Sequence, residues 1–381
     1  MNVEDSVKNR YAAAAHQSEA ALCCPVDYDA RYLEAIPAEV IEKDYGCGDP
    51  SKYVNEGEAV LDLGSGTGKI CFIASQVVGP KGAVIGVDMT DDMLEVARRN
   101  IPVVAERIGH SNVEFRKGKI QDLALNYDSL EKFLETNPVT DGASLEKMEM
   151  EAARLRKEEP LIENDSVDVV VSNCVLNLVA SEEKEQLFRE ILRVLKRGGR
   201  AVISDIVSDE PVPEHLQRDD RLWSGCISGA LTEEGFLKAF EKAGFYGIEF
   251  LKFETQPWQV VEGIEFRSVT VQAFKGKDGP CMDHNQAVIY KGPFKQVIDD
   301  DGHTLRRGMR QAVCEKTYQI YSGAAYEGMF ETISPREAVD PEKAPQFDCH
   351  RMEHRSPRET KGLDYSHTSD PSQSCGDGGC C

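Results

Sequence analysis

The chain has 381 residues, and 66 acidic against 44 basic side chains give it a formal net charge of −22. This charge argues against nucleic acid and anionic membranes as partners, since both bind basic surfaces. The N-terminus is acidic and no apolar run approaches about eighteen residues, so we expect neither a secretory signal nor a membrane span. The 12 cysteines are too scattered for a disulfide framework. We therefore expect a cytoplasmic, monomeric protein whose thiols are reduced.

A glycine-rich turn follows the first predicted strand, within residues 59–68, which read AVLDLGSGTG. After Asp62, glycines recur at every second position, as Gly64, Gly66 and Gly68. Glycine allows a tight turn with a ligand against the backbone, and the helix predicted next presents free amides to that ligand. The third glycine comes one residue earlier than in the dinucleotide fingerprint. The segment instead resembles the motif of S-adenosylmethionine-dependent methyltransferases, which implies S-adenosylmethionine as cofactor.

The second predicted strand ends in a carboxylate, Asp88. A carboxylate at this position can accept both ribose hydroxyls of a nucleoside, although it can also simply cap the helix that follows. Met89 is a soft apolar side chain suited to lie against an adenine face. After the third predicted strand, the methyltransferase resemblance implies that Ile120 and Gln121 border the adenine.

The remaining elements complete an α/β pattern. Residues 126–163 are rich in Glu and Lys at helical spacing, which predicts a solvated helical insertion. A strand at 166–172, a helix and a Gly-Gly turn precede a strand at 201–205, and two more strands are predicted at 248–251 and 267–274. This order resembles the class I methyltransferases and implies a Rossmann-like sheet with helices on both faces. We expect an N-terminal extension at 1–56, a methyltransferase domain at 57–278, a small C-terminal α+β module at 279–335, and a disordered tail at 336–381.

Four cysteines stand out by their positions. Cys174 follows Asn173 just past the fourth strand, where the ends of parallel strands face the cofactor crevice and a methyl acceptor has to sit. Cys71 lies one turn into the helix after the glycine loop, and Cys226 lies in a small-residue segment after the fifth strand. Cys47 lies in the N-terminal extension, in a glycine-flanked loop that we expect to be flexible. Taken singly, each cysteine reads as a buried structural thiol, but thiols that converge on one crevice favour a ligand set.

These four contexts resemble those of arsenite methyltransferases. The matching motifs are Y-G-C-G at Cys47, the position after the glycine loop at Cys71, S-N-C-V-L-N-L at Cys174, and the segment before G-A-L at Cys226, within roughly residues 20–335. The resemblance implies that Cys71, Cys174 and Cys226 bind trivalent arsenic. It implies that Cys47 exchanges arsenic or forms a disulfide with Cys71, which glutathione or thioredoxin then reduces. The expected cofactor residues are Asp62, Gly64, Gly66, Gly68, Asp88, Met89, Ile120, Gln121 and Asn173.

The chemistry of arsenic explains why thiols are needed. Trivalent arsenic is soft and thiophilic, and soft thiolates are the matching ligands. Three sulfurs in a pyramid leave a lone pair on arsenic that can attack a sulfonium methyl group. Catalysis is then mostly positioning, and no general base is needed because arsenic has no proton to lose.

Two other functions share part of this pattern. A generic methyltransferase that acts on carbon or oxygen of a metabolite has the same fold, but it predicts a general base or carboxylate near the fourth strand. A non-catalytic thiol buffer or sensor of metalloids has no use for Asp62, Asp88 and the glycine loop.

Cysteines outside the methyltransferase domain carry a weaker signal. Vicinal pairs in both terminal segments are able to capture arsenite, although the interpretation we favour is a tail whose thiols do nothing essential. Cys281 and His284 together make a poor zinc site, because two ligands are too few. The terminal cysteines are Cys23, Cys24, Cys375, Cys380 and Cys381.

Overall fold

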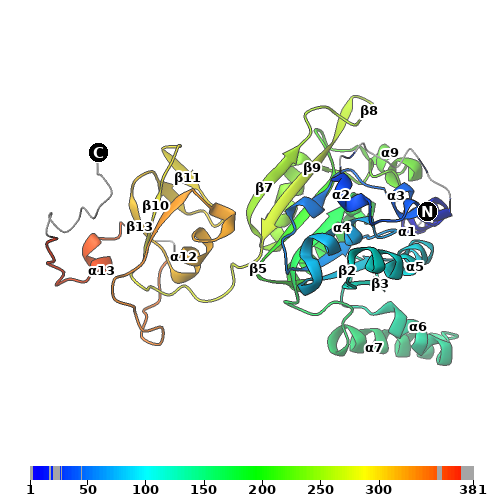
Figure 1. Cartoon of the computed structure of the whole chain (residues 1–381), viewed down its shortest axis with the longest axis horizontal. Helices are drawn as coiled ribbons and strands as arrows, with labels where there is room; N and C mark the ends of the chain where they lie inside the picture. Colours follow the sequence, from blue (N-terminus) through cyan, green and yellow to red (C-terminus); the bar gives the residue numbers. More distant parts are fainter. Residues whose placement is uncertain are drawn as a thin grey trace. The chain divides into compact units, whose positions relative to one another are not determined.

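The computed structural model of the chain describes residues 3–16, 19, 26, 28–43, 45–349 and 354–369 (Figure 1). It consists of two compact units that meet in sequence between Gly276 and Lys277. None of the helices in the described ranges is both long and apolar enough to span a bilayer.

The first unit is built on one large mixed sheet. Five parallel strands are followed by one strand that runs antiparallel to them and by a last strand that is antiparallel to that one, and two short strands pair with the ends of interior strands. This confirms the predicted class I methyltransferase fold. In spatial order the strands are β3 (Val113–Lys117), β2 (Ala83–Asp88), β1 (Ala59–Leu63), β4 (Val167–Asn173), β5 (Leu195–Ser208), β9 (Ile264–Phe274) and β7 (Tyr246–Phe253), with β6 (Leu231–Thr232) on β5 and β8 (Gln259–Val261) on β9.

Strand β5 begins earlier than predicted. Leu195 already pairs with Val167 of β4, and the regular register resumes at Arg200 after an irregularity. The Gly-Gly turn expected between helix and strand is therefore part of the strand, where Gly198 takes the left-handed backbone that glycine tolerates.

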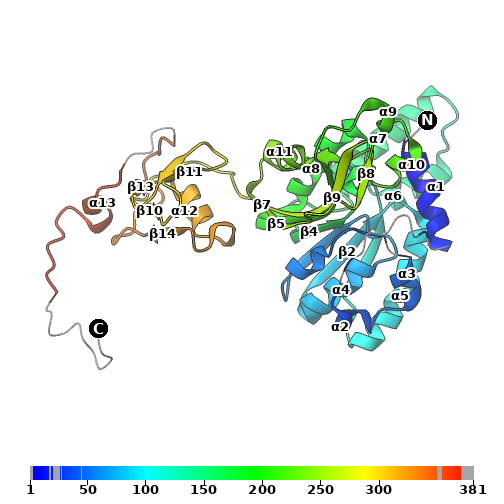
Figure 2. The ribbon, with the colours of Figure 1, turned by 90° about the horizontal axis from the view of Figure 1, so that it is seen from above.

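Helices cover both faces of this sheet (Figure 2). Side chains alternate along a strand, so Val60 and Leu61 of β1 belong to different clusters. Val60 packs with α4 (Lys69–Val78) and α5 (Asp91–Ile108), whereas Leu61 packs with α8 (Lys184–Val194) and α11 (Glu233–Ala243).

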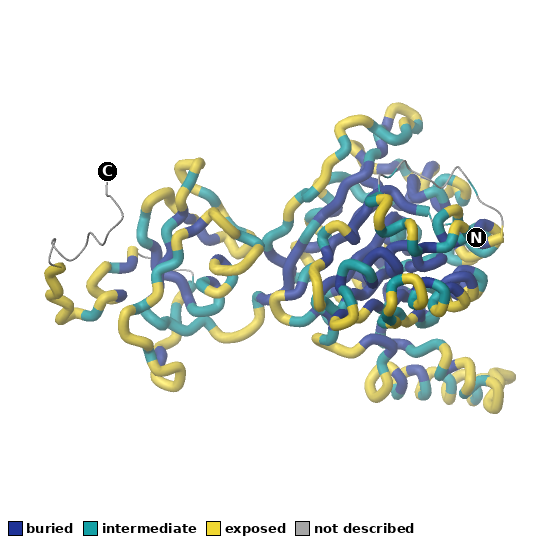
Figure 3. The backbone as a smooth tube through the Cα atoms, viewed as in Figure 1, coloured by how far each residue is buried: buried dark blue, intermediate teal, exposed yellow. Residues whose placement is uncertain are grey.

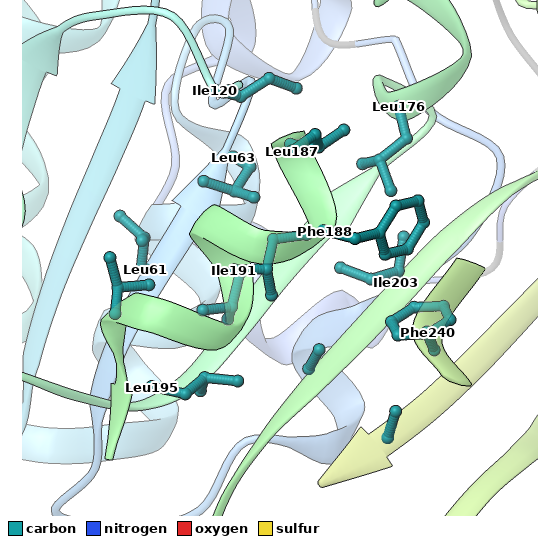
Figure 4. Close-up of a cluster of buried hydrophobic side chains, with 14 of the residues drawn as sticks. Leu61, Leu63, Ile120, Leu176, Leu187, Phe188, Ile191, Leu195, Ile203 and Phe240 are labelled. Carbon is teal, nitrogen blue, oxygen red and sulfur yellow. The ribbon is translucent and has the colours of Figure 1, made fainter. Parts of the chain in front are cut away.

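The cluster under α8 is drawn in Figure 4. Phe188 of α8 and Phe240 of α11 are almost completely buried, and their rings meet edge to face with centroids 4.8 Å apart. Burying one such ring stabilises the fold by about 1.5–3 kcal/mol. Truncation of Phe240 to Ala also leaves a cavity and costs about 3–5 kcal/mol.

The predicted helical insertion is a pair of helices, α6 (Tyr127–Thr136) and α7 (Gly142–Glu158). They share a small core that includes Leu130 and Leu155. The rest of their surface is largely exposed (Figure 3), as the Glu and Lys content predicted.

The N-terminal extension and the segment after β5 add short elements. The extension forms α1 (Val3–His16), α2 (Ala30–Leu33), α3 (Ala38–Glu42) and the turn η2 (Pro50–Tyr53); the later segment forms α9 (Glu214–Gln217) and α10 (Asp220–Trp223).

The second unit is a small α+β module with its own core. Tyr321 stacks on Phe330 at 4.4 Å, beside Tyr290. A three-stranded antiparallel sheet, a hairpin and two helices surround this core. They are β10 (Ala287–Tyr290), β13 (Arg310–Ala312) and β14 (Phe330–Ile333), the hairpin β11 (Gln296–Ile298) and β12 (Thr304–Arg306), and the helices α12 (Glu315–Tyr321) and α13 (Pro357–Lys361).

The described residues beyond 335 differ from the predicted disordered tail. The buried Arg355 donates to the Asp283 carboxylate at 2.6 Å, and the amide of Arg336 donates to the carbonyl of Thr360 at 2.7 Å. These contacts tie the segment to the module. Residues 370–381, with the three terminal cysteines, lie outside the described residues, as do Cys23 and Cys24.

Candidate active site

The glycine loop joins β1 to α4 and is held by the neighbouring strand. The amide of Gly66 donates to Oδ2 of Asp88 at 2.9 Å, and the amide of Thr90 donates to Oδ1 at 2.8 Å. Burial raises the pKa of Asp88. Asp88 therefore supports the loop and holds the amide of Thr90, the N-cap residue of α5, but it does not itself cap the helix.

A cavity of about 590 Å³ opens beside this loop. Its size falls in the usual range for small-molecule sites. The cavity reaches from the glycine loop to the thiol-bearing end of β4, where Cys174 forms part of its wall. The predicted residues that line it are Gly64, Gly66, Asp88, Met89, Ile120, Gln121 and Cys174.

Three predicted cofactor residues make other contacts. The Asp62 carboxylate accepts a hydrogen bond from the thiol of Cys71 at 3.2 Å. Gly68 is the left-handed N-cap of α4, where a Cβ would strike the ring of Phe115. The side-chain oxygen of Asn173 accepts from the amides of Cys47 and Gly48, both at 3.0 Å. Asn173 thus fixes the loop that carries a cysteine.

Three cysteines from distant segments meet at the end of β4. The sulfur atoms of Cys47 and Cys174 and a carboxylate oxygen of Asp205 all lie within 4.8 Å of one another. The thiol of Cys226 donates to the carbonyl oxygen of Cys174 at 3.0 Å. All three thiols are buried. Hydrogen bonding to Cys226 and to Cys47, together with burial, raises the pKa of Cys174 well above its ordinary value.

Two of these cysteines have an unusual backbone. Cys174 has φ +64° and Cys226 has φ +63°, in the left-handed region that residues with a side chain rarely adopt. Such conformations cost of order 1 kcal/mol or more and persist where the surroundings impose them. The amide of Cys174 donates to the Ser204 carbonyl at 2.7 Å, which fixes this turn.

The Cys47 loop needs its flanking glycines. A Cβ on Gly46 would lie 2.1 Å from the side chain of Asn173, and one on Gly48 would lie 2.4 Å from the hydroxyl of Ser204. The hydroxyl of Ser268 donates to the Cys47 carbonyl at 2.6 Å. The Y-G-C-G motif is therefore a close-packed loop, not a flexible one.

The structure does not bring Cys71 into this cluster. Its side chain is fully buried against the sheet, where its sulfur would lie 2.8 Å from a Cβ on Gly86. Its thiol donates to the Asp62 carboxylate, so this hydrogen bond requires Cys71 to keep its proton. The reason is helical phase: position 71 faces the sheet side of α4 and not the glycine turn.

Two buried ionisable groups near the thiols, Asp205 and Lys184, were not predicted from the sequence. Asp205 accepts from the amides of Leu176 at 2.9 Å and Ile206 at 2.8 Å. Burial, with the nearby Cys47, raises the pKa of Asp205 to about 7. Burial lowers the pKa of Lys184 to about 8, and its ammonium donates to backbone carbonyls, including that of Gly229 at 2.6 Å. The sequence feature that could have indicated Asp205 is the position of this acid at the end of the apolar fifth strand.

Helix α1 forms part of the cavity wall, which the sequence analysis did not predict. Arg10 donates to the Ser224 hydroxyl at 2.8 Å, and Glu4 accepts from Lys119 at 2.7 Å. The hydroxyl of Tyr11 hydrogen-bonds the thiol of Cys226. Burial, followed by the nearby Cys226 and Cys174, raises the pKa of Tyr11 well above its ordinary value.

Comparison with known proteins agrees with this geometry. The chain is 32% identical over 352 residues to an arsenite methyltransferase of Aquipseudomonas alcaligenes, which covers 87% of this chain and 91% of that protein. The chain belongs to the arsenite methyltransferase family. The human arsenite methyltransferase is 32% identical over 307 residues, covering 77% of this chain and 72% of the human protein.

Family models and a solved structure add detail to this family assignment. A model described as a methyltransferase domain matches residues 54–159 and 137–244. A second, described as a domain of unknown function, matches residues 277–365. The crystal structure of an arsenic(III) S-adenosylmethionine methyltransferase from Chlamydomonas reinhardtii matches with a TM-score of 0.55 and 29% identity, covering 85% of this chain and all of that one.

Proposed function

We propose that this arsenite methyltransferase family member transfers methyl groups from S-adenosylmethionine to trivalent arsenic held by Cys47, Cys174 and Cys226. The observation that supports this most is the shared cavity. One wall of it is the glycine loop with Asp88, and another carries Cys174, whose thiol contacts both other thiols.

The residues beside the glycine loop fit the cofactor. Ser65 lies within the loop, and its buried hydroxyl has no hydrogen-bond partner among the described residues. Asp88 offers carboxylate oxygens for ribose hydroxyls, and Met89 and Ile120 offer apolar surface for a base. When bound, S-adenosylmethionine supplies an electrophilic methyl group, for which the arsenic lone pair is the nucleophile.

Arsenic loading is a thiol exchange. Arsenous acid has three hydroxyl groups; each As–O bond that breaks is replaced by an As–S bond, and each thiol proton leaves with hydroxide as water. Arsenic stays trivalent in this exchange. The raised pKa of Cys174 means that this thiol arrives protonated and surrenders its proton in this step.

The thiol assignment differs from the sequence expectation in one ligand. Cys47 contacts Cys174, whereas Cys71 contacts Asp62, so we assign Cys47 as the third sulfur. Adding a methyl cation to arsenic raises its formal oxidation state by two. Once the Cys47 loop has moved toward α4, attack of the Cys71 sulfur on the Cys47 sulfur would break the As–S bond and form a Cys47–Cys71 disulfide. The electron pair of the broken bond would stay on arsenic, and the one thiol proton of Cys71 would be released. Glutathione or thioredoxin would then reduce that disulfide.

The generic methyltransferase alternative would need a carboxylate near β4, and Asp205 is such a group. Its oxygens, however, accept backbone amides of Leu176, Asn177 and Ile206. Asp205 is also absent from the described residues that line the cavity. We therefore assign it to the support of the thiol cluster.

The direct test is incubation of the chain with arsenite, S-adenosylmethionine and glutathione, followed by arsenic speciation with mass spectrometry. We expect methylated arsenic from the wild type and none from Cys174→Ser. Cys349→Ser, which changes a half-buried thiol of the second unit, is the matched control and should keep the activity. Unmethylated arsenic together with normal S-adenosylmethionine binding would remove arsenic as the substrate.

A further inference from the structure

A second group of three thiols lies in the C-terminal module. The sulfur atoms of Cys281, Cys314 and Cys349 all lie within 4.8 Å of one another. All three cysteines are free; Cys314 is fully buried and the other two are half-buried. They come from three separate segments of the module, so their meeting is a product of its fold.

Backbone hydrogen bonds fix this meeting point. The amide of Phe347 donates to the Cys281 carbonyl at 2.8 Å, and Met282 forms an antiparallel β-bridge with Gln346. These contacts align the segments around Cys281 and Cys349. The amide of Glu315 donates to the Met282 carbonyl at 2.8 Å, which places Cys314 against the same segment. These hydrogen bonds hold the three segments that carry the sulfurs in place.

One thiol of the group is poised to ionise. Burial opposes ionisation of Cys281, but hydrogen bonds from Cys349 and Cys314 and the charge of Lys316 outweigh it, and the pKa of Cys281 is lowered. Burial raises the pKa of Cys349. A lowered pKa favours the Cys281 thiolate, which is the form of a thiol that attacks as a nucleophile.

We infer that Cys281, Cys314 and Cys349 form a second binding site for trivalent arsenic, in which the three sulfurs replace its three hydroxyl groups. Three As–O bonds break and three As–S bonds form, and the three thiol protons leave in three waters. No oxidant or reductant is needed. The site requires only thiol exchange and no methyl transfer, so it stands independently of the proposed activity.

The donor set favours arsenic over zinc. A structural zinc site takes four ligands, whereas the compact group found among the described residues contains three sulfurs and no fourth donor. His284, three residues after Cys281 in the sequence, pairs instead with the Glu315 carboxylate at 3.4 Å. A cavity of about 660 Å³ is lined by Cys281 and Cys349, which gives arsenous acid or its thiol adduct access to these sulfurs.

The experiment counts arsenic atoms per chain. The terminal cysteines are replaced by serine in every arm, and arsenite is added before gel filtration removes what is free. The expected arsenic-to-protein ratio is two for this background, one with Cys174→Ser and Cys226→Ser, one with Cys281→Ser and Cys349→Ser, and zero with all four changes. The terminal replacements are Cys23→Ser, Cys24→Ser, Cys375→Ser, Cys380→Ser and Cys381→Ser.

The two half-buried thiols are changed because the buried Cys314 also caps α12, where it accepts from the amide of Thr317. Unchanged thermal melting shows that the variants remain folded. Arsenic X-ray absorption of the Cys174→Ser, Cys226→Ser arm should show three sulfur neighbours. A ratio unaffected by Cys281→Ser and Cys349→Ser would overturn the inference. One zinc per purified chain, lost in the same variant, would overturn it as well.

Discussion

The thiol of Cys226 donates to the carbonyl of Cys174 at 3.0 Å, and both residues hold a left-handed backbone. Two loops, one after β4 and one after α10, therefore place their cysteines against each other at some conformational cost. Stability alone would not select two such residues, since the cost disfavours them. Their pairing is instead the arrangement expected of a preformed site for a thiophilic substrate.

Cys174→Ser and Cys226→Ser should each abolish methylation of arsenite, because a hydroxyl is a poor ligand for a soft centre. Serine is nearly isosteric, so the fold and the binding of S-adenosylmethionine should survive. Calorimetry with the cofactor and speciation of the arsenic product check both statements. Near-normal turnover in either variant would make that thiol structural.

Asp88→Ala should weaken binding of S-adenosylmethionine by about 1.5–3 kcal/mol, the range for loss of a charge-assisted hydrogen bond. Affinity should also fall as the pH falls, because protonation removes the acceptor. Since burial raises the pKa of Asp88, this fall should begin at a higher pH than for an exposed aspartate. Calorimetry over a pH series measures both effects. An affinity unchanged by the substitution would remove Asp88 from the ribose site.

Tyr11→Phe should remove a hydrogen bond to Cys226 without changing the shape of the cavity. A net hydrogen bond contributes about 1 kcal/mol, so kcat/KM for arsenite should fall roughly fivefold. The affinity for S-adenosylmethionine should stay the same. Tyr318→Phe, which removes a hydroxyl bonded to Ser334 in the second unit, is the matched control. Equal rates in both variants would leave Tyr11 with a packing role.

Asp205→Asn should change how stability depends on pH. The folded-state pKa of Asp205 is about 7, above the value of about 3.9 in an unfolded chain. The stability that this proton contributes is therefore fully present below about pH 4 and lost as the pH rises through about 7. The pKa of Lys184 is lowered to about 8. The stability that neutral Lys184 contributes is therefore present at high pH and is lost as the pH falls through about 8, so it does not change between pH 4 and pH 7.

The unfolding free energy of the wild type relative to Asp205→Asn should thus decrease between pH 5 and pH 7, by on the order of 1–3 kcal/mol. Urea unfolding at both pH values measures this change. Asp128→Asn alters an exposed carboxylate of α6 and is the matched control. A difference that stays constant between the two pH values would contradict the assignment of the raised pKa to Asp205.

Local pattern was sufficient to predict the strands, the glycine loop and the thiol at the end of β4, because each is a property of consecutive residues. It was insufficient for Cys71, whose side-chain direction depends on how α4 packs on the sheet. Asn173 was expected at the cofactor, but its contacts lie with a loop more than a hundred residues earlier. Tyr11, Asp205 and the module's three cysteines depend on long-range folding in the same way.

The most direct test compares arsenite and monomethylarsenite as substrates for four single variants at fixed glutathione. Arsenite has three exchangeable positions and monomethylarsenite has two, so only the first needs three sulfurs. Cys174→Ser and Cys226→Ser should methylate neither substrate. Cys47→Ser should lose activity on arsenite because the third sulfur is missing, and Cys71→Ser because the disulfide step is blocked; both should still methylate monomethylarsenite. Equal loss on both substrates in all four variants would contradict the account.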